Sequence, residues 1–558
     1  MVRRLPDFTR TQRMNFRQIV APVLIIALTL ALAFELPQAI AARDRDYDWY
    51  TPVIDVRTLL NERFVREIDL DAMQRAAIAA MVDSLGDPHT IYVPPRDTMV
   101  FEKEMSGQYT GIGAEIRGAN DRLMIITPLD GSPALEAGLR HGDMLLTIDG
   151  TDTKGIGPEA CIDLLLGEPG TKVELRIRRP NGTETDIAVT RAPIAAPTVE
   201  GLLRRDGQWQ HWFDEASGLA YVEVDQFTGT TVPELRRFLS EHGDALQGLV
   251  IDLRGNPGGA LPAAVQSADL FMADGPIVHI KPQRDDRADE AHTYSARKGH
   301  AAEDIPVVVL VDQHAASASE ILAGALASGD ARVVGERTFG KGSVQELRTL
   351  DDDHGLVKFT TALYALPDGR ILQRHPEDPK ADWGVDPSPG CVVPEDEVQR
   401  FARRQAREPW RVISASEPQA PKATDATWMR DTLLDPALAE AAALLHERVS
   451  GGQWPTLEAD TDLAFDPPSQ DLTLARDARL VLLEQLNRVD REILRLTDGG
   501  IEAAMGFGAL PDDAKIGGLE VVLRNADGVI IGTWKAANPR AAHAALHAAQ
   551  LKKVDDTP

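Results

Sequence analysis

Three near-continuous apolar runs constrain the fold of this chain most strongly. They span residues 219–224, 248–253 and 306–311. Such runs suit strands that are covered on both faces by helices, and strands of that kind usually belong to a parallel sheet. Helical patterns lie between or after the runs, at residues 232–239, 262–271 and 318–327. The sequence therefore predicts an α/β core, to which we assign residues 193–395.

Residues 107–192 follow a different pattern, in which short strands alternate with turns. Strands are expected at 123–127, 144–148, 173–178 and 185–189, and short helices at 134–137 and 158–166. Pro180-Asn181-Gly182 supplies the hairpin turn between the last two strands. This pattern predicts a small β-rich domain ahead of the α/β core.

The other segments are assigned by periodicity and composition. Residues 50–106 are expected to form a helical leader, because apolar residues recur in them at helical spacing. Residues 396–450 are predicted to hold a linker at 414–427 and a helix at 438–449. Residues 451–558 are predicted to form an α+β region of unassigned role, with an amphipathic helix at 475–496 and a hairpin at 519–534.

The first 42 residues are typical of an export signal. Five arginines precede an apolar run at 19–34, and Ala39 and Ala41 supply the small residues of a cleavage site. We therefore expect an exported, periplasmic protein. An uncleaved signal that anchors the chain in the inner membrane is the alternative, although the run is slightly short for a span.

Charge and cysteine content narrow the classes of partner. The formal net charge is −27 at pH 7, and a surface this acidic repels phosphate backbones, so nucleic acid is not an expected partner. Cys161 and Cys391 are the only cysteines and cannot form a disulfide framework. Cys161 is expected to be a small buried residue, and a single bridge between the two stays open.

Ser317 stands where the run at 306–311 gives way to the helix expected at 318–327. At such a junction the helix amides and the helix dipole point at an incoming oxygen, which suits a nucleophile. Serine is also a favoured helix N-cap, and on this segment alone the cap is the simpler interpretation.

Lys341 lies between Gly340 and Gly342 in a turn after a strand expected at 331–335. A lysine can act as a general base only when it is neutral, and burial favours the neutral form. Serine paired with lysine is an established variant of the serine nucleophile with an adjacent base. The alternative is a solvated loop lysine, which is the usual fate of this residue type.

A glycine-rich turn, Asp252-Leu253-Arg254-Gly255-Asn256-Pro257-Gly258-Gly259, comes directly after the strand expected at 248–251. Glycines let backbone N–H groups approach a ligand closely, as an oxyanion hole requires. The segment alone is also compatible with an ordinary tight turn. It lacks the Gly-Lys-Ser/Thr ending of a phosphate-binding loop.

Together these segments resemble the carboxyl-terminal processing peptidases, also called tail-specific proteases. The resemblance covers roughly residues 50 to 395 in the family's order: helical leader, PDZ domain and protease core. It is carried by Tyr109-Thr110-Gly111-Ile112-Gly113, by short motifs at 132–134, 137–139 and 142–143, and by the core segments at 252–259, 317–320 and 338–342. It implies a serine endopeptidase with an α/β, crotonase-like core that cleaves near protein C-termini.

The resemblance also implies roles for single residues. The family's nucleophile falls on Ser317, its base on Lys341, and the third member on Gln345, which would orient the lysine amine. Two features depart from the family: Asp312 stands where Asn is usual, and the spacing from Ser317 to Lys341 is one residue shorter. Neither departure removes a catalytic group.

The oxyanion donors of the family correspond here to Gly258 or Gly259 and to the amide of Ala318. The loop Thr110-Gly111-Ile112-Gly113 would hold the terminal carboxylate of a peptide that adds to a sheet edge of the PDZ domain. Expected partners are proteins or peptides with accessible C-termini, while a homodimer or a regulatory partner is left open. A Ser/Lys mechanism needs no metal and no cofactor, and we expect none.

Three other interpretations stay open. His314 lies in the nucleophile loop and competes as the base, although three residues before a serine is not triad geometry by itself. A PDZ scaffold without catalysis would have no need of Ser317, Lys341 and Gln345 together. A third interpretation assigns the function to residues 451–558, as a dimerisation or partner-binding module.

Overall fold

The computed structural model describes residues 48–98, 101, 108–119, 122–299, 302–351, 354–374, 382–414, 418, 421, 423–457, 519–524 and 530–536. The chain divides into two compact units, Met1–Tyr92 and Val93–Pro558. The expected export signal at 1–42 and the expected helix at 475–496 lie outside the described residues. Within the described part, no helix is both long and apolar enough to cross a membrane.

A largely parallel sheet forms the centre of the second unit, as the apolar runs predicted. Four of its strands run parallel in spatial order: β14 (Leu219–Val224), β15 (Gly248–Asp252), β18 (Val307–Val311) and β19 (Arg332–Gly335). Every residue of the first three is buried. The short strands β10 (Val199–Glu200) and β13 (Trp212–Asp214) pair antiparallel with β14.

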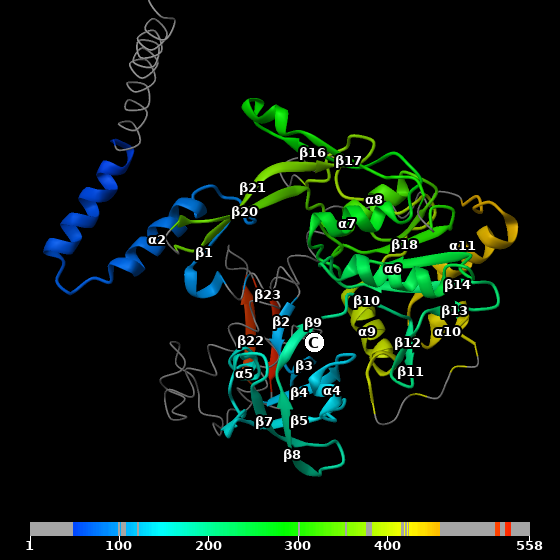
Figure 1. Ribbon diagram of the computed structural model, residues 1–558, viewed down its shortest axis with the longest axis horizontal. Helices are drawn as coiled ribbons and strands as arrows, with labels where there is room; N and C mark the ends of the chain where they lie inside the picture. The colour runs from blue at the N-terminus through cyan, green and yellow to red at the C-terminus, as the bar shows by residue number, and fades with distance from the viewer. Residues whose placement is uncertain are drawn as a thin grey trace, which may run out of the picture. The chain divides into compact units, whose positions relative to one another are not determined.

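Helices cover both faces of this sheet (Figure 1). One face packs against α6 (Thr231–His242), α7 (Leu261–Asp269) and α8 (Ala318–Ala327). The other packs against α10 (Ala426–Asp431) and α11 (Pro436–Gly451). Alternate residues of one strand serve the two layers: Leu249 and Ile251 face the first, and Val250 faces the second. Burial on both faces explains why these strands lack an apolar/polar alternation.

A second, antiparallel sheet lies beside the core. Its strands include β16 (Pro276–Pro282), β17 (His292–Ser295), β20 (Ser343–Thr349) and β21 (Leu356–Ala365). β21 pairs with β16 through one edge and with β20 through the other. β20 matters for function because it begins directly after the turn that carries Lys341.

The small β-rich domain is observed where the alternating pattern predicted it. Its sheet has the order β3 (Ala114–Ala119), β4 (Arg122–Pro128), β5 (Met144–Ile148), β7 (Lys172–Arg178) and β8 (Glu184–Thr190), with β6 (Thr151–Asp152) beside β5. The helices α4 (Pro133–Glu136) and α5 (Pro158–Leu165) complete the domain. Among the described strands β3 pairs with β4 alone, which puts it at the edge of this sheet.

Three two-stranded ladders of the described residues lie outside these sheets. β2 (Gln108–Gly111) pairs with β9 (Ala192–Ala195), and β11 (Leu203–Arg205) pairs with β12 (Gln208–Gln210). The predicted C-terminal hairpin is confirmed by the antiparallel pair β22 (Leu519–Arg524) and β23 (Ile530–Ala536).

Two predictions of local structure need correction. The helical leader is present as a helix at 48–63 and as α2 (Leu70–Asp83), but residues Ile91–Val93 form a strand, β1, instead of continuing it. The predicted linker at 414–427 is shorter than expected, because α10 begins at Ala426. A further helix, α9 (Glu397–Arg411), precedes that linker and was not predicted.

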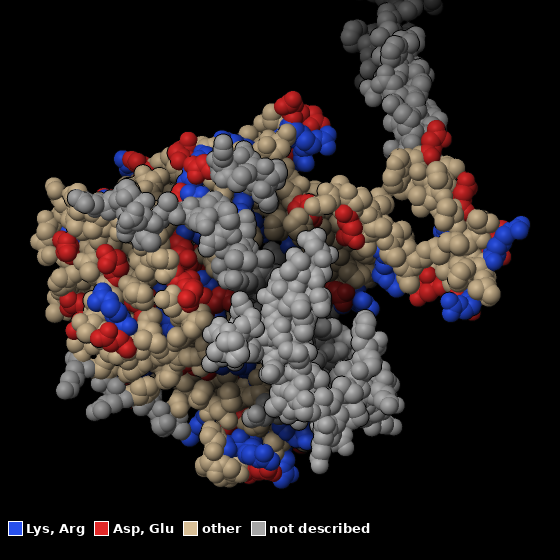
Figure 2. Space-filling view, turned by 180° about the vertical axis from the view of Figure 1, so that it is seen from behind, with Lys and Arg blue, Asp and Glu red and all other residues tan. Residues whose placement is uncertain are grey.

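The surface and the cysteines agree with the composition. Acidic and basic side chains are interspersed over the face drawn in Figure 2. Cys161 and Cys391 are both buried and both are free thiols, so the bridge that the sequence left open is not present. Burial raises the pKa of the Cys391 thiol to about 11, which disfavours the reactive thiolate.

Candidate active site

Ser317 occupies a strained position at the start of α8. It is the N-cap residue of that helix, with φ 56° and ψ −112°, and its exposed fraction is 7%. A residue with a side chain rarely adopts positive φ, and such strain costs about 1–3 kcal/mol unless the surroundings impose it. The surroundings therefore fix the backbone that carries the Ser317 hydroxyl.

The carboxylate of Glu320 supplies much of this constraint. Its Oε2 atom accepts hydrogen bonds from the backbone N–H groups of Ser317 and Lys341, both at 2.8 Å. Its Oε1 atom accepts from the Gly340 N–H at 2.7 Å and from the Thr338 hydroxyl at 2.6 Å. Ser317 and Lys341 are therefore held with their amides on one oxygen atom, although the sequence separates them widely.

Glu320 is fully buried, and within the described part of the chain its hydrogen-bond donors are three backbone N–H groups and a hydroxyl, none of them a cation. Burial raises the pKa of Glu320, and its hydrogen bonds with Thr338, Gly340, Ser317 and Lys341 offset only part of that rise. A buried carboxylate that accepts four hydrogen bonds has little freedom to move, and it holds its four donors in fixed directions.

The turn around Lys341 depends on its two glycines. Gly340 has φ +86°, and a Cβ at that position would lie 2.7 Å from the ring of Trp383. A Cβ on Gly342 would lie 2.3 Å from the backbone nitrogen of Gln373. Lys341 itself is partly buried. The close packing explains why a Gly-Lys-Gly sequence is needed here.

Gln345 lies on β20, on the strand that follows the lysine turn. Its Nε2 group donates to the hydroxyl of Ser343 at 2.7 Å and to that of Thr360 at 3.3 Å. These two bonds fix the orientation of the side-chain amide. The Oε1 atom is the part of Gln345 suited to accept a hydrogen bond from an amine.

The glycine-rich turn packs directly against the start of α8. Gly258 has φ +101°, and a Cβ there would lie 2.6 Å from the carbonyl oxygen of Ala316 and 2.9 Å from the nitrogen of Ala318. Gly258 donates its own N–H to Asn256 Oδ1 at 2.8 Å. Gly259 is exposed and has φ +141°. The structure therefore brings Gly258 and Ala318 together beside Ser317, while Gly259 follows Gly258 in the chain and pairs with Phe227.

Asn256 joins the two loops that meet at Ser317. Its carbonyl oxygen accepts from the Ala316 N–H and from the Ser319 hydroxyl, both at 3.0 Å. Its side chain donates to the carbonyl of Val224 at 2.6 Å. The Ser319 hydroxyl is thus engaged in holding the glycine-rich turn, and Ser319 is fully buried.

Asp312 makes a second link between the same loops. Its Oδ1 atom accepts from the N–H groups of Gly255, His314 and Ala315 at 2.9, 3.0 and 3.0 Å. The departure from the family's usual Asn therefore keeps an acceptor at this position. His314 lies in the same loop, and burial lowers the pKa of its imidazole.

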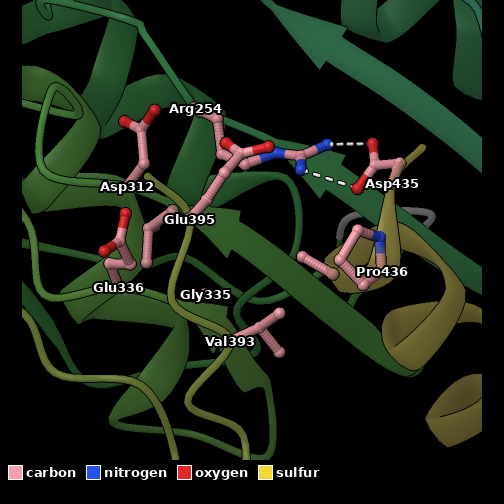
Figure 3. Close-up of a pocket in the computed structure, with 10 residues that line it drawn as sticks. Arg254, Asp312, Gly335, Glu336, Val393, Glu395, Asp435 and Pro436 are labelled. Atoms are coloured by element: carbon pink, nitrogen blue, oxygen red, sulfur yellow. Dashed lines mark hydrogen bonds and ion pairs between the residues drawn. The ribbon is translucent and has the colours of Figure 1, made fainter. Parts of the chain in front are cut away.

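Arg254 anchors the beginning of the glycine-rich turn (Figure 3). Its guanidinium pairs with Asp435 through two bonds of 2.8 and 2.7 Å, and with Asp252 at 3.0 and 2.7 Å. Burial raises the pKa of Asp252, but the attraction and hydrogen bonds of Arg254 outweigh burial, so the pKa lies well below its usual range. Asp435 was not predicted, although Asp-Pro is a readable start for a helix.

Of the segment Thr110-Gly111-Ile112-Gly113, the first two residues end β2 and the last two connect it to β3. The carbonyl oxygens of Ile112 and Gly113 accept from the N–H groups of Ala134 and Leu129, at 2.8 and 3.0 Å. Gly113 has φ +73°, and a Cβ there would lie 2.5 Å from the Cβ of Ser132. The loop is thus fixed through its acceptors and is remote in sequence from Ser317.

Comparison with known proteins separates the same two parts of the chain, the α/β core and the β-rich domain. The family model described as peptidase family S41 matches residues 218–387, and a PDZ domain model matches residues 124–179. A probable CtpA-like serine protease of Staphylococcus aureus (strain COL) is 31% identical over 373 residues, which cover 66% of this chain and 71% of that protein. A protein of the same description from Staphylococcus haemolyticus (strain JCSC1435) is 32% identical over 315 residues, covering 56% of this chain and 60% of its own.

Among solved structures, the photosystem II D1 C-terminal processing protease is 31% identical to this chain. The match covers 61% of this chain and 85% of that one, with a TM-score of 0.35.

Proposed function

The chain belongs to peptidase family S41 and is a serine peptidase of the C-terminal processing type, and we propose that Ser317 is its nucleophile and Lys341 its general base. The observation that carries this proposal is the shared acceptor of the two residues. One oxygen of Glu320 binds the backbone N–H of both Ser317 and Lys341. Two residues that must exchange a proton are thereby held at one point of the fold.

The hydrogen bonds favour Ser317 over Ser319 as the nucleophile. Ser319 is fully buried and donates its hydroxyl to the carbonyl of Asn256. Ser317 instead has the strained backbone and the position at the helix N-terminus that suit a nucleophile. The Ser319 hydroxyl is explained by its structural contact.

In the proposed reaction, neutral Lys341 takes the proton of the Ser317 hydroxyl as Oγ attacks the scissile carbonyl carbon. The resulting oxyanion is stabilised by the N–H groups of Ala318, the residue after Ser317, and of Gly259, the residue after Gly258. Gly258 contributes less directly, because its N–H is donated to Asn256. The lysine then returns the proton to the leaving amine, which frees the first product and leaves an acyl-enzyme.

A water molecule completes the cycle. Lys341 accepts a proton from the water as it attacks the ester, and returns that proton to Ser317 as the acid product leaves. Gln345 acts as a neutral partner, whose Oε1 orients the lysine amine without stabilising its charge as a carboxylate would. The two bonds of its Nε2 group support that orientation.

The β-rich domain is proposed to bind substrate tails. The loop Thr110-Gly111-Ile112-Gly113 would hold the terminal carboxylate, and the peptide would add to the free edge of β3. A long substrate with an amidated C-terminus should then show a KM about tenfold higher than its free acid, which corresponds to about 1.4 kcal/mol. A short peptide that ends at the cleavage site should respond much less.

The export signal expected at 1–42 supports a proposal that the enzyme works in the periplasm, free or anchored to the inner membrane. Fractionation of cells that express the full chain tests this directly. Activity recovered in the cytoplasmic fraction alone would contradict it.

Four variants test the chemical proposal. Ser317→Ala should abolish peptide hydrolysis, while Ser319→Ala should keep substantial activity. Lys341→Arg should be inactive despite its charge, because a guanidinium does not give up its proton. His314→Ala should remain close to wild type in kcat/KM against pH. An active Ser317→Ala, or a His314→Ala profile that loses the ionisation, would overturn the assignment.

A further inference from the structure

The glycine-rich turn is held near its start by the guanidinium of Arg254, which two carboxylates bind. Arg254 binds Asp252 through Nε and Nη2, and Asp435 through Nη1 and Nη2. The exposed fractions of the three side chains are 4%, 2% and 0%. Because two carboxylates grip the planar group, its orientation has little freedom. The position of the turn therefore depends on where the two carboxylates stand.

The two carboxylates come from two parts of the chain, one inside and one outside the region that the family model matches. Asp252 is the last residue of β15, inside the region that the family model matches. Asp435 is the N-cap of α11, beyond residue 387, where that match ends. Asp435 also accepts from the N–H of Leu438 at 2.9 Å, so its carboxylate is bound to the helix and to Arg254 at once.

α11 is itself firmly placed. Its buried residues pack on β14, β15, β18 and β19 through Leu438, Ala441, Ala442 and Leu445. The helix thus gives Asp435 a fixed position, from which it binds Arg254 as Figure 3 shows. A helix outside the matched protease region therefore holds Arg254, near the start of the turn.

The turn carries this position forward to the reacting groups. Gly255, next to Arg254, donates its N–H to Asp312 in the nucleophile loop. Gly258 then packs against Ala316 and Ala318, which flank Ser317. A small displacement of Arg254 is therefore transmitted to the Gly259 N–H and to its alignment with the Ala318 N–H.

We propose that Asp435 is a positioning residue for the oxyanion-binding turn and that it acts through Arg254. This inference rests on the proposed function, in which Gly259 and Ala318 bind the oxyanion. It means that the catalytic unit extends through α11 and does not end with the matched region. Asp435 does not touch substrate, so its effect is on the transition state and not on substrate binding.

Asp435→Ser tests the proposal, because serine keeps the N-cap of α11 and cannot reach Arg254 as aspartate does. Misplacement of about 1 Å at a catalytic group can cost about 100-fold in rate. We expect kcat on a short peptide to fall about 10- to 100-fold with KM within about threefold. The Ki of a peptide aldehyde should rise by the same factor as kcat/KM falls, because its adduct with Ser317 presents an oxyanion to the turn.

Two matched controls separate positioning from stability. Asp425 is the exposed N-cap of α10 and accepts from the Trp428 N–H, so Asp425→Ser makes the same change at a cap away from Arg254. Leu445→Ala weakens the packing of α11 without touching the arginine. With the assay held well below the melting temperature of each variant, both controls should keep kcat and aldehyde Ki within about twofold of wild type.

The outcomes are distinct. If Asp435→Ser does not fold, Asp435→Asn keeps the cap and one acceptor and should lose about three- to tenfold in kcat, with the same aldehyde response. Wild-type kcat in the folded variant, an equal loss in Leu445→Ala, or a loss confined to KM would overturn the inference. An active Ser317→Ala would overturn the proposed nucleophile instead, and the two failures are therefore separable.

Discussion

Two buried carboxylate clusters hold the two sides of the site in different ways. On the nucleophile side, Glu320 binds only N–H and hydroxyl donors, from Ser317, Thr338, Gly340 and Lys341. On the opposite side, Asp252 and Asp435 share the charge of Arg254. Glu320 therefore orients the groups around it through hydrogen bonds from neutral donors, which do not neutralise its charge. The aspartates instead hold Arg254 in place through an ion pair.

The difference appears in the pKa values. Burial raises the pKa of Glu320, and its neutral donors do not fully compensate. Burial also raises the pKa of Asp435, but the attraction of Arg254 more than compensates and the net shift is downward. As the pH falls, Glu320 should therefore be protonated before Asp435. The lysine turn, which Glu320 holds, is therefore the side of the site more sensitive to protonation.

The largest effect should follow Glu320→Ala. The change leaves four donors without their acceptor in a buried site, at a cost of about 1–3 kcal/mol for each unsatisfied group. We expect kcat/KM to fall at least about 100-fold, because Ser317 and Lys341 lose their common anchor. Peptide hydrolysis and thermal unfolding, measured on the same sample, check the result.

Glu320→Gln serves as the control in shape. It keeps the volume but turns one acceptor into a donor that faces N–H groups, so its activity should lie between wild type and alanine. An alanine variant with kcat/KM within tenfold of wild type would show that the backbone alone aligns the two residues.

The next effect should follow Asp252→Asn and should appear mainly as stability. The change breaks a buried ion pair and should lower the free energy of unfolding by about 3–5 kcal/mol at pH 7. Asp252 has a depressed folded-state pKa, so its stabilisation is present above the unfolded value of about 3.9 and is lost as pH falls below it. The variant should therefore lose less stability than wild type between pH 5 and pH 2.5.

Urea unfolding at several pH values measures this slope. Parallel curves for wild type and Asp252→Asn would mean that the ion pair does not control acid stability, and the contrast with Glu320 would fail.

Glu336 gives a smaller effect of opposite sign. Burial raises the pKa of Glu336 to about 7, although Arg400 lies 3.6 Å away. The folded state therefore holds a proton that the unfolded chain loses near pH 4.3, and wild-type stability falls as pH rises from there to 7. Glu336→Gln should match wild type at pH 4.5 and exceed it by about 1–3 kcal/mol at pH 8. An unchanged difference across this range would place Glu336 in solvent.

Much of the fold could be predicted because burial on two faces leaves a clear pattern. The runs that became β14, β15 and β18 are apolar because helices cover both sides. The helix α11 was predicted for the same reason, since its buried face is apolar. The helix α9 was missed because its buried residues are Arg400, Arg403 and Arg407, which no search for apolar periodicity finds.

The residues of the site also differ in whether the sequence alone could identify them. Each of Ser317, Lys341 and the glycine-rich turn has an ordinary structural explanation by itself, and they could be singled out because together they stand in the order and spacing of a known family. Asp435 could not, because its contact with Arg254 spans 181 residues. A capping box did mark the start of α9, where Asp396 accepts from Gln399 and Gln399 binds back. That signal identifies a helix start but not which face is buried.

The smallest effect tests the reversed polarity of α9. Three of its arginines are buried, among them Arg407, which lies 3.0 Å from Glu223, while Phe401 is 59% exposed. Phe401→Ser should therefore change the free energy of unfolding by less than about 0.5 kcal/mol, as an exposed substitution does. Arg407→Ala should cost more, about 1–3 kcal/mol, because it removes one of the two guanidinium groups that pair with the buried Glu223 and leaves only Arg411. An apolar residue on this helix would thus matter less than a charged one. Urea unfolding of both variants at pH 7 measures the two values, and the reverse order would mean that α9 presents its apolar face to the core.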